Sequence, residues 1–160
     1  MLRILMVCMG NICRSPMAEE VTRVALARAG LAGDVVVDSA GTHGYHAGEP
    51  PDERARQVAA KRGYDLSRLR ARKVVDEDFQ RFDLLLAMDR DNLASLERRG
   101  PADAIERVRL FLDFAGGETL EVPDPYYGNL AGFERVLDLC EAGADGLVRA
   151  IRAGILKSGG

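Results

Sequence analysis

The sequence predicts an α/β fold, a three-layer α/β/α arrangement with a four-stranded, mainly parallel, twisted sheet and helices on both faces, as in Rossmann-like proteins. Strands alternate with helices along the chain, which is the pattern of a parallel sheet. Residues 84–86 are three leucines in a row, as expected for a strand that is buried on both faces. Ligands of such sheets bind beyond the carboxyl ends of the strands, so we expect a functional site there.

Each strand is predicted from a short apolar run. Residues 2–7 form the first, and residues 34–40 contain three consecutive valines, a β-branched residue that favours strands. Residues 82–88 form the third run and residues 108–112 the fourth. These four runs supply the four strands of the expected sheet.

The helices are predicted from apolar residues spaced three and four apart, and from the residues at their ends. A helix is expected over residues 16–29, with Pro16 in its first position. Asp52 would cap a second helix, which ends at Gly63. Asp89 would cap a third helix, which follows the third strand.

The last helix is expected over residues 130–155, where apolar side chains form one stripe. Gly143 and Gly146 each cost about 1 kcal/mol relative to alanine in a helix, so they are candidate positions for a bend or break. Cys140 lies on the apolar stripe and is expected in the core. Residues 113–128 form a long loop before this helix, and loops of that length are often functional.

Length and composition indicate one globular domain, residues 1–160. The formal net charge of −3 argues against nucleic acid as a partner. No apolar run is long enough to span a bilayer, and the N-terminus lacks the pattern of a signal peptide. Two of the three cysteines share one short loop, which favours reduced thiols over a disulfide framework. We therefore expect a cytoplasmic protein without a membrane partner.

The most informative segment is the run of residues 8–15, directly after the first strand. The backbone N–H groups of such a loop can turn inward and, with the N-terminus of the next helix, bind a tetrahedral oxyanion. The same field would stabilise a thiolate at Cys8, and the guanidinium of Arg14 can contact two oxygens at once. The alternative is a buried core cysteine, but Gly10 and Asn11 accept positive φ angles and favour the loop.

A thiolate that attacks phosphorus needs a proton donor for the leaving oxygen. Asp124 is the candidate, because it lies between two prolines and precedes two tyrosines. The alternative is an ordinary turn residue. In combination with the Cys8 loop, a general acid is the favoured interpretation.

The segments 7–16 and 124–128, with 38–42 and 82–89 between them, resemble the low-molecular-weight protein tyrosine phosphatases. The likeness covers essentially the whole chain. It implies the fold of the phosphotyrosine phosphatase I type and hydrolysis of phosphotyrosine and small aryl phosphates through a cysteinyl-phosphate intermediate, without a metal or other cofactor. The implied partner is a phosphotyrosine-containing protein or peptide, with phosphate, sulfate or vanadate as inhibitors.

The resemblance also implies a role for each site residue. Cys8 would be the nucleophile, Arg14 would stabilise the transition state, and Asp124 would act first as acid and then as base. The other implied residues bind the phosphate, support its loop or enclose the aromatic ring. The phosphate-binding loop consists of Met9, Gly10, Asn11, Ile12, Cys13, Arg14 and Ser15. The residues that support the loop are Asn11, Ser15 and Ser39, with a hydrogen bond between Asn11 and Ser39. The walls of the substrate crevice are Tyr45, Tyr126 and Tyr127.

Two further features concern the loop itself. Many relatives carry a histidine in the segment that corresponds to residues 67–70, and this chain has none, so the contacts that complete the support of Asn11 are left open. In the family a second loop cysteine forms a reversible disulfide with the nucleophile, which implies a Cys8–Cys13 pair; the other interpretation is that Cys13 fills space.

The remaining polar residues are given ordinary roles. His43 and His46 have no cysteine pair near them, so no metal site is expected. Arginines 68, 70 and 72 are expected to be solvated.

Two other functions were compatible with parts of this pattern. A thiol-dependent arsenate reductase of the same fold needs two further cysteines, and only Cys140 is left for that purpose. A non-catalytic phosphopeptide-binding module would be expected to lack the nucleophile or the acid, and both are present.

Overall fold

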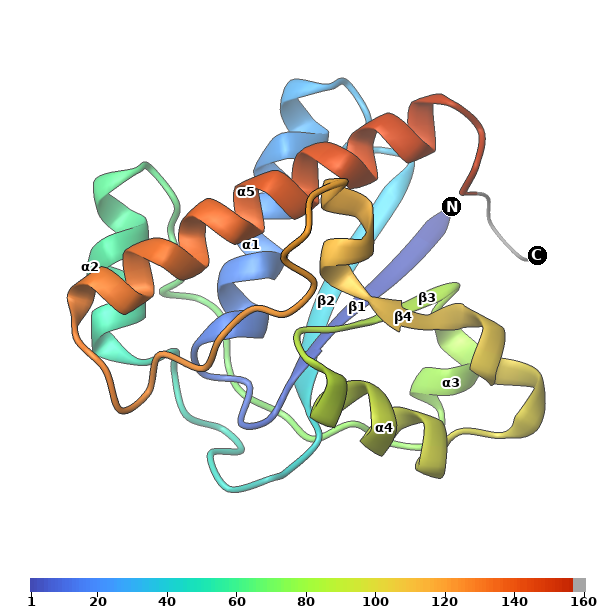
Figure 1. The fold of residues 1–160 in the computed structure, drawn as a ribbon, viewed down its shortest axis with the longest axis horizontal. Helices are drawn as coiled ribbons and strands as arrows, with labels where there is room; N and C mark the ends of the chain where they lie inside the picture. Colours follow the sequence, from blue (N-terminus) through green and yellow to red (C-terminus); the bar gives the residue numbers. More distant parts are fainter. Residues whose placement is uncertain (157–160) are drawn as a thin grey trace.

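A four-stranded parallel sheet forms the centre of the computed structural model, which describes residues 1–156 (Figure 1). The predicted domain of residues 1–160 extends past this range, and its last residues lie outside the described ones. The strands are β1 (Leu2–Cys8), β2 (Val35–Gly41), β3 (Leu84–Ala87) and β4 (Val108–Leu110). Their order is β2-β1-β3-β4, and every pair is parallel. The predicted fold class is therefore confirmed.

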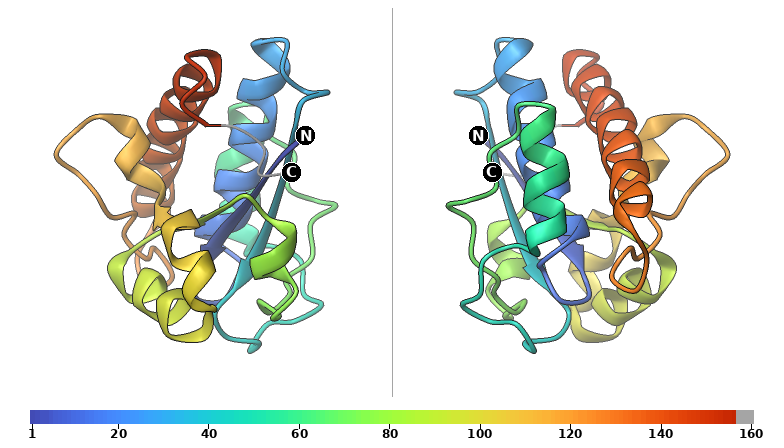
Figure 2. Two further views of the ribbon diagram at one scale, coloured as in Figure 1. Left: turned by 90° about the vertical axis from the view of Figure 1, so that its right-hand side faces the viewer. Right: turned by 90° about the vertical axis from the view of Figure 1, so that its left-hand side faces the viewer.

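The two faces of the sheet are covered by different helices, and β1 shows why. Successive side chains of a strand point to opposite faces. Ile4 and Met6 pack in a core with the helices α1 (Arg14–Arg28), α2 (Glu53–Lys61) and α5 (Leu130–Arg152). Leu5 and Val7 pack in a second core with α3 (Asp78–Arg81) and α4 (Arg90–Arg99), on the opposite side of the sheet (Figure 2).

Most element ends lie within a few residues of the predicted ones. Asp52 and Asp89 cap α2 and α4, because their carboxylates accept hydrogen bonds from the backbone N–H groups of Arg54 and Asn92. α1 begins two residues earlier than predicted, which places Pro16 within the first turn rather than in first position. Proline is tolerated there because first-turn N–H groups have no partner within the helix.

Three short helices escaped prediction. These are α3 and the 3₁₀ helices η1 (Ala102–Arg107) and η2 (Phe111–Ala115). η2 begins directly after Leu110, so the fourth strand is shorter than predicted and the following loop begins later. Elements of four to six residues are too short to show a helical period in the sequence.

The sequence made Gly143 and Gly146 candidate positions for a bend or break in the last helix. The helix has no break there, because α5 runs through both glycines. Both glycines allow η2 to approach the helix. A Cβ on Gly146 would lie 1.7 Å from the carbonyl oxygen of Phe114, and one on Gly143 would lie 2.4 Å from the ring of Phe111. The glycines are therefore explained by close packing rather than by bending.

Replacing Gly146 with alanine is expected to lower the free energy of unfolding by about 1–3 kcal/mol, the range for overpacked cores. The added methyl group would meet backbone, which has little freedom to move. Denaturant unfolding measures the change. Gly117→Ala is the control, because its added Cβ has no atom within 4 Å; equal unfolding midpoints for the two variants would contradict the packing explanation.

Within residues 1–156, no helix combines the length and the apolar character needed to cross a membrane.

Candidate active site

The loop after β1 lies at the carboxyl end of the sheet, between the ends of the two neighbouring strands (Figure 1). Cys8 is the last residue of β1 and Arg14 is the first residue of α1. Both line one cavity of about 300 Å³ together with Asp124, which comes from the loop before α5. The structure thus brings together three residues that are as many as 116 positions apart.

The other predicted residues divide into two groups around this cavity. Its walls include His46 and most of the residues that the sequence assigned to loop and crevice: Met9, Gly10, Ile12, Cys13, Tyr45, Tyr126 and Tyr127. Asn11, Ser15 and Ser39 are buried and do not line it. They lie behind the loop, where a supporting role requires them.

The backbone of the loop is oriented by hydrogen bonds from its outside. The carbonyl oxygens of Cys8, Met9 and Ile12 accept from the N–H groups of Thr42, His43 and Asp52, at 2.8–2.9 Å. Within residues 1–156, several loop N–H groups have no hydrogen-bond partner: those of Met9, Gly10, Ile12, Cys13, Arg14 and Ser15. Because the carbonyl groups are held outward, these donors are available to an anion.

The neighbouring strand approaches this loop closely. A Cβ on Gly41, the last residue of β2, would lie 2.7 Å from the carbonyl oxygen of Met9 and 3.2 Å from the backbone nitrogen of Asn11. A larger residue there would push the loop away from the sheet. Gly41 is therefore part of the loop's support, although the sequence assigned it no role.

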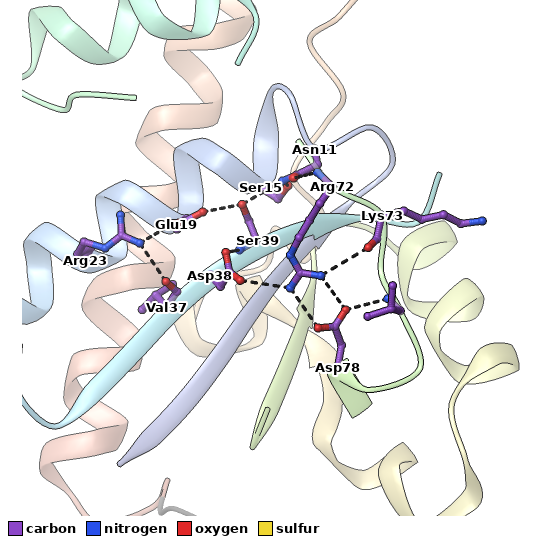
Figure 3. Close-up of polar contacts among 11 residues, drawn as sticks. Asn11, Ser15, Glu19, Arg23, Val37, Asp38, Ser39, Arg72, Lys73 and Asp78 are labelled. Atoms are coloured by element: carbon purple, nitrogen blue, oxygen red, sulfur yellow. Dashed lines mark hydrogen bonds and ion pairs between the residues drawn. The ribbon is translucent and has the colours of Figure 1, made fainter. Parts of the chain in front are cut away.

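Asn11 holds the loop in its turn. Its φ is +59°, in the left-handed region that asparagine adopts more readily than most residues. The side-chain amide donates to Ser15 Oγ at 2.7 Å and to Ser39 Oγ at 3.0 Å. The bond between Asn11 and Ser39 that the resemblance implied is present, and Figure 3 shows how the three side chains meet.

The sulfur of Cys8 is surrounded by hydrogen-bond donors. Ser15 Oγ lies 3.0 Å from Cys8 Sγ, and the backbone N–H of Asn11 donates to the sulfur at 3.3 Å. Because Ser15 Oγ already accepts from Asn11, its own proton is free to point at the sulfur. Both contacts place a hydrogen-bonding group against the sulfur.

The chain of hydrogen bonds ends at a buried carboxylate that the sequence did not single out. Ser39 Oγ donates to Glu19 Oε1 at 2.6 Å, and Arg23 pairs with the other oxygen (Figure 3). Burial raises the pKa of Glu19, although the bonds from Ser39 and Arg23 oppose that rise. Because the Ser39 proton is donated to Glu19, Ser39 Oγ is left to accept from the Asn11 amide.

Arg72 completes the contacts of Asn11 and corrects the prediction that it is solvated. Its backbone N–H donates to Asn11 Oδ1 at 3.0 Å, which fixes the amide orientation. Its guanidinium makes two bonds, of 2.9 and 3.1 Å, to the fully buried Asp78, and a third to Asp38 (Figure 3). Arg68 and Arg70 are exposed, as predicted. A backbone group two residues after the segment 67–70, which lacks the family's histidine, thus serves Asn11.

Arg14 is held rigidly although it lies in a loop-to-helix junction. It donates to Asp89 Oδ2 at 2.6 Å and to the carbonyl oxygen of Val122 at 3.1 Å, and its second nitrogen lies 3.8 Å from Asp124. Burial works to lower the pKa of Arg14, but the charges of Cys8, Asp89 and Asp124 outweigh it and raise the pKa. Asp89 therefore does two things, since its other oxygen caps α4.

The other two cysteines, Cys13 and Cys140, are buried thiols with a raised pKa. Burial raises the pKa of Cys13, and the nearby carboxylate of Asp52 raises it further. Burial also raises the pKa of Cys140, which is fully enclosed in the core as predicted. All three cysteines are free thiols. In the part of the chain that the structure describes, no cluster of histidine, cysteine and carboxylate side chains could hold a metal ion.

Aromatic rings surround the mouth of the cavity. Tyr45 stacks on His43, with ring centroids 5.1 Å apart, and Tyr126 meets Tyr127 edge to face at 5.0 Å. Tyr127 is 94% exposed and Tyr45 is 75% exposed. His46 packs against Gly10 and also lines the cavity.

Comparison with known proteins agrees with this geometry. The family model described as low molecular weight phosphotyrosine protein phosphatase matches residues 3–156. A low molecular weight protein-tyrosine-phosphatase of Streptomyces coelicolor is 46% identical over 155 residues, which cover 94% of this chain and 93% of that protein.

Solved structures show the same fold. A crystal structure of a protein tyrosine phosphatase from Entamoeba histolytica, with Hepes in the active site, gives a TM-score of 0.94 at 41% identity and covers 98% of this chain and 100% of that one. The structure of Vibrio vulnificus Wzb in complex with benzylphosphonate gives a TM-score of 0.82 at 27% identity, and the match covers 92% of this chain and 97% of that one. From a family match over nearly the whole sequence and from these relatives, we conclude that this chain belongs to the low molecular weight phosphotyrosine protein phosphatases, a family of enzymes.

Proposed function

We propose that this phosphatase hydrolyses phosphotyrosine in proteins and peptides, and small aryl phosphates, through a cysteinyl-phosphate intermediate and without a metal. The main support is that Cys8, Arg14 and Asp124 line one cavity, in which Cys8 is only 2% exposed. A phosphate group at the end of a phenyl ring reaches such a buried residue more easily than one on a short serine side chain.

In the first step, the thiolate of Cys8 attacks phosphorus, and a sulfur–phosphorus bond forms as the bond to the phenolic oxygen breaks. The free N–H groups of the loop, from Met9, Gly10 and residues 12–15, and the guanidinium of Arg14 hold the non-bridging oxygens. Asp124 gives its proton to the leaving oxygen. In the second step, the Asp124 carboxylate takes a proton from water, which attacks phosphorus, and the thiolate and phosphate are released.

The walls of the cavity support an aromatic substrate. Tyr45, Tyr126 and Tyr127 present ring surfaces on which a phenyl group can stack. Hepes is a sulfonate and benzylphosphonate joins a phenyl ring to a phosphonate, so both ligands of the related structures carry a tetrahedral oxyanion. Phosphate, sulfate and vanadate are expected to inhibit by binding at the same place.

The alternatives are not favoured. An arsenate reductase would pass a disulfide outward through further cysteines, and Cys140 is fully buried in the core. A binding module without activity does not explain the conjunction of thiol, guanidinium and carboxyl groups. Three free thiols in this chain are consistent with action in the reducing cytoplasm.

The proposal is tested with the purified protein, a phosphotyrosine peptide and a chelator. We expect phosphate release to proceed with the chelator present, and to be much slower for the matched phosphoserine peptide. Rapid acid quenching followed by peptide mass mapping should find phosphate on Cys8. Phosphate on another residue, or turnover only after a divalent cation is added, would rule out the proposed mechanism.

A further inference from the structure

The segment that carries Asp124 has few attachments to the rest of the protein. We call residues 123–128 the acid loop. Its own two hydrogen bonds join Tyr126 N to Asp124 Oδ1 and Gly128 N to the carbonyl oxygen of Pro125. Just before the acid loop, the backbone N–H of Val122 donates to the carbonyl oxygen of Met88, and the Val122 carbonyl oxygen accepts from Arg14. Helix α5 begins shortly after the acid loop. Within residues 1–156, the only side chain outside the acid loop that donates a hydrogen bond to its backbone is that of Arg54.

Arg54 contacts the acid loop at two points. One guanidinium nitrogen donates to the carbonyl oxygen of Tyr126 at 2.9 Å, and the other donates to that of Gly128 at 3.3 Å. The guanidinium carbon also lies 5.6 Å from the centre of the Tyr126 ring and 4.7 Å from that of Phe133, in the first turn of α5. These contacts use the planar fork and the flat face of arginine together.

Arg54 is itself tied to the phosphate loop. The Asp52 carboxylate accepts from Arg54 at three positions, with distances of 2.8, 3.0 and 3.1 Å. Burial would raise the pKa of Asp52, but its bonds with Arg54 lower it, so the carboxylate stays ionised. The backbone N–H of Asp52 donates to the carbonyl oxygen of Ile12 at 2.8 Å. A continuous line of bonds therefore runs from Ile12 to Tyr126 and Gly128.

We propose that Arg54 is a positioning residue for the general acid, because it holds the acid loop at a set distance from the phosphate loop. The inference rests on the proposed role of Asp124. With the Arg54 contacts in place, the Asp124 carboxylate lies 3.8 Å from Arg14, at the cavity that Cys8 also lines. Without Arg54, the acid loop would keep its two ends and the 3.8 Å contact of Asp124 with Arg14, but no side chain of residues 1–156 outside it would donate a hydrogen bond to its backbone, and Asp124 would occupy the position for proton transfer for a smaller fraction of the time.

The expected signature is a dependence on the leaving group. Proton donation matters most when the leaving oxygen is basic, as in phenyl phosphate, and least when it is stabilised, as in 2,4-dinitrophenyl phosphate. Arg54→Ala should lower kcat/KM for phenyl phosphate by about 10- to 100-fold, and should lower it much less for the dinitrophenyl ester. A change that merely loosened the fold would lower both values alike.

The experiment measures kcat/KM for both esters in the wild type, Arg54→Ala, Asp124→Ala and the double variant. We expect the double variant to be no slower with phenyl phosphate than Asp124→Ala alone, because two changes that act through one group are not additive. Arg56→Ala is the matched control: it removes an arginine from the same helix, whose hydrogen bond goes to the carbonyl oxygen of Pro51 rather than to the acid loop.

The outcomes separate this inference from the proposed function. If Asp124→Ala shows the leaving-group dependence and Arg54→Ala does not, only the role of Arg54 is overturned. Losses that multiply in the double variant, or an Arg56→Ala loss equal to that of Arg54→Ala, overturn it as well. If Asp124→Ala shows no leaving-group dependence, the general-acid assignment and this inference are both wrong.

Discussion

Replacing Cys8 with serine is expected to reduce hydrolysis of aryl phosphates to the uncatalysed background, while vanadate and phosphate still bind. The hydroxyl group is a far weaker nucleophile than a thiolate at neutral pH. The groups that hold the anion, Arg14 and the free N–H groups of Met9, Gly10 and residues 12–15, are unchanged by the substitution. Steady-state turnover and calorimetric titration with vanadate measure the two properties separately.

The control is Cys140→Ala, which removes a thiol from the core and leaves the cavity intact. It is expected to retain turnover, with at most a modest loss of stability. Substantial activity in Cys8→Ser would exclude covalent catalysis at this sulfur. Loss of vanadate binding in a folded Cys8→Ser protein would mean that the loop is not the anion site.

Replacing Asp124 with alanine is expected to lower kcat/KM for phenyl phosphate by about 10²–10⁴-fold, the usual contribution of acid–base catalysis. The variant leaves Cys8 and Arg14 in place, so binding of the anion should persist. The loss should shrink for esters with less basic leaving groups, because these depart without a proton. A series of substituted phenyl phosphates measures this dependence.

Asp103→Ala serves as the control for charge, since Asp103 is an exposed carboxylate on η1 and does not line the cavity. It should leave the whole series unchanged. An Asp124→Ala variant with nearly normal activity toward phenyl phosphate would show that the proton comes from another group.

The loop at Cys8 was predictable because its parts are consecutive in the chain. A buried strand, a glycine and an asparagine that accept positive φ, and a helix start together define a turn of this type. The same locality explains the caps at Asp52 and Asp89, where one carboxylate and a nearby N–H group suffice. Local rules failed at Gly143 and Gly146, since the atoms that require glycine there belong to η2.

The partners of the site residues were not predictable, because they are distant in sequence. Nothing near Arg14 indicates that it pairs with Asp89, 75 residues away. Arg72 looks like one of several surface arginines, and only the fold shows that its backbone N–H serves Asn11, 61 residues away. Arg54 likewise seems an ordinary helix residue, and only the path of the acid loop shows that two carbonyl groups face it.

The order of the amino acids alone was enough to derive the strand–loop–helix unit and the parallel α/β layers, because these depend on neighbouring residues and on regular apolar spacing. With the family resemblance, it was also enough to propose Cys8, Arg14 and Asp124 as the thiol, the guanidinium and the acid. Folding decided how those groups are held. Buried polar groups must find partners, and here the buried Glu19 and Arg14 meet Ser39 and Asp89 from other elements. Such pairs are created only when distant segments pack together.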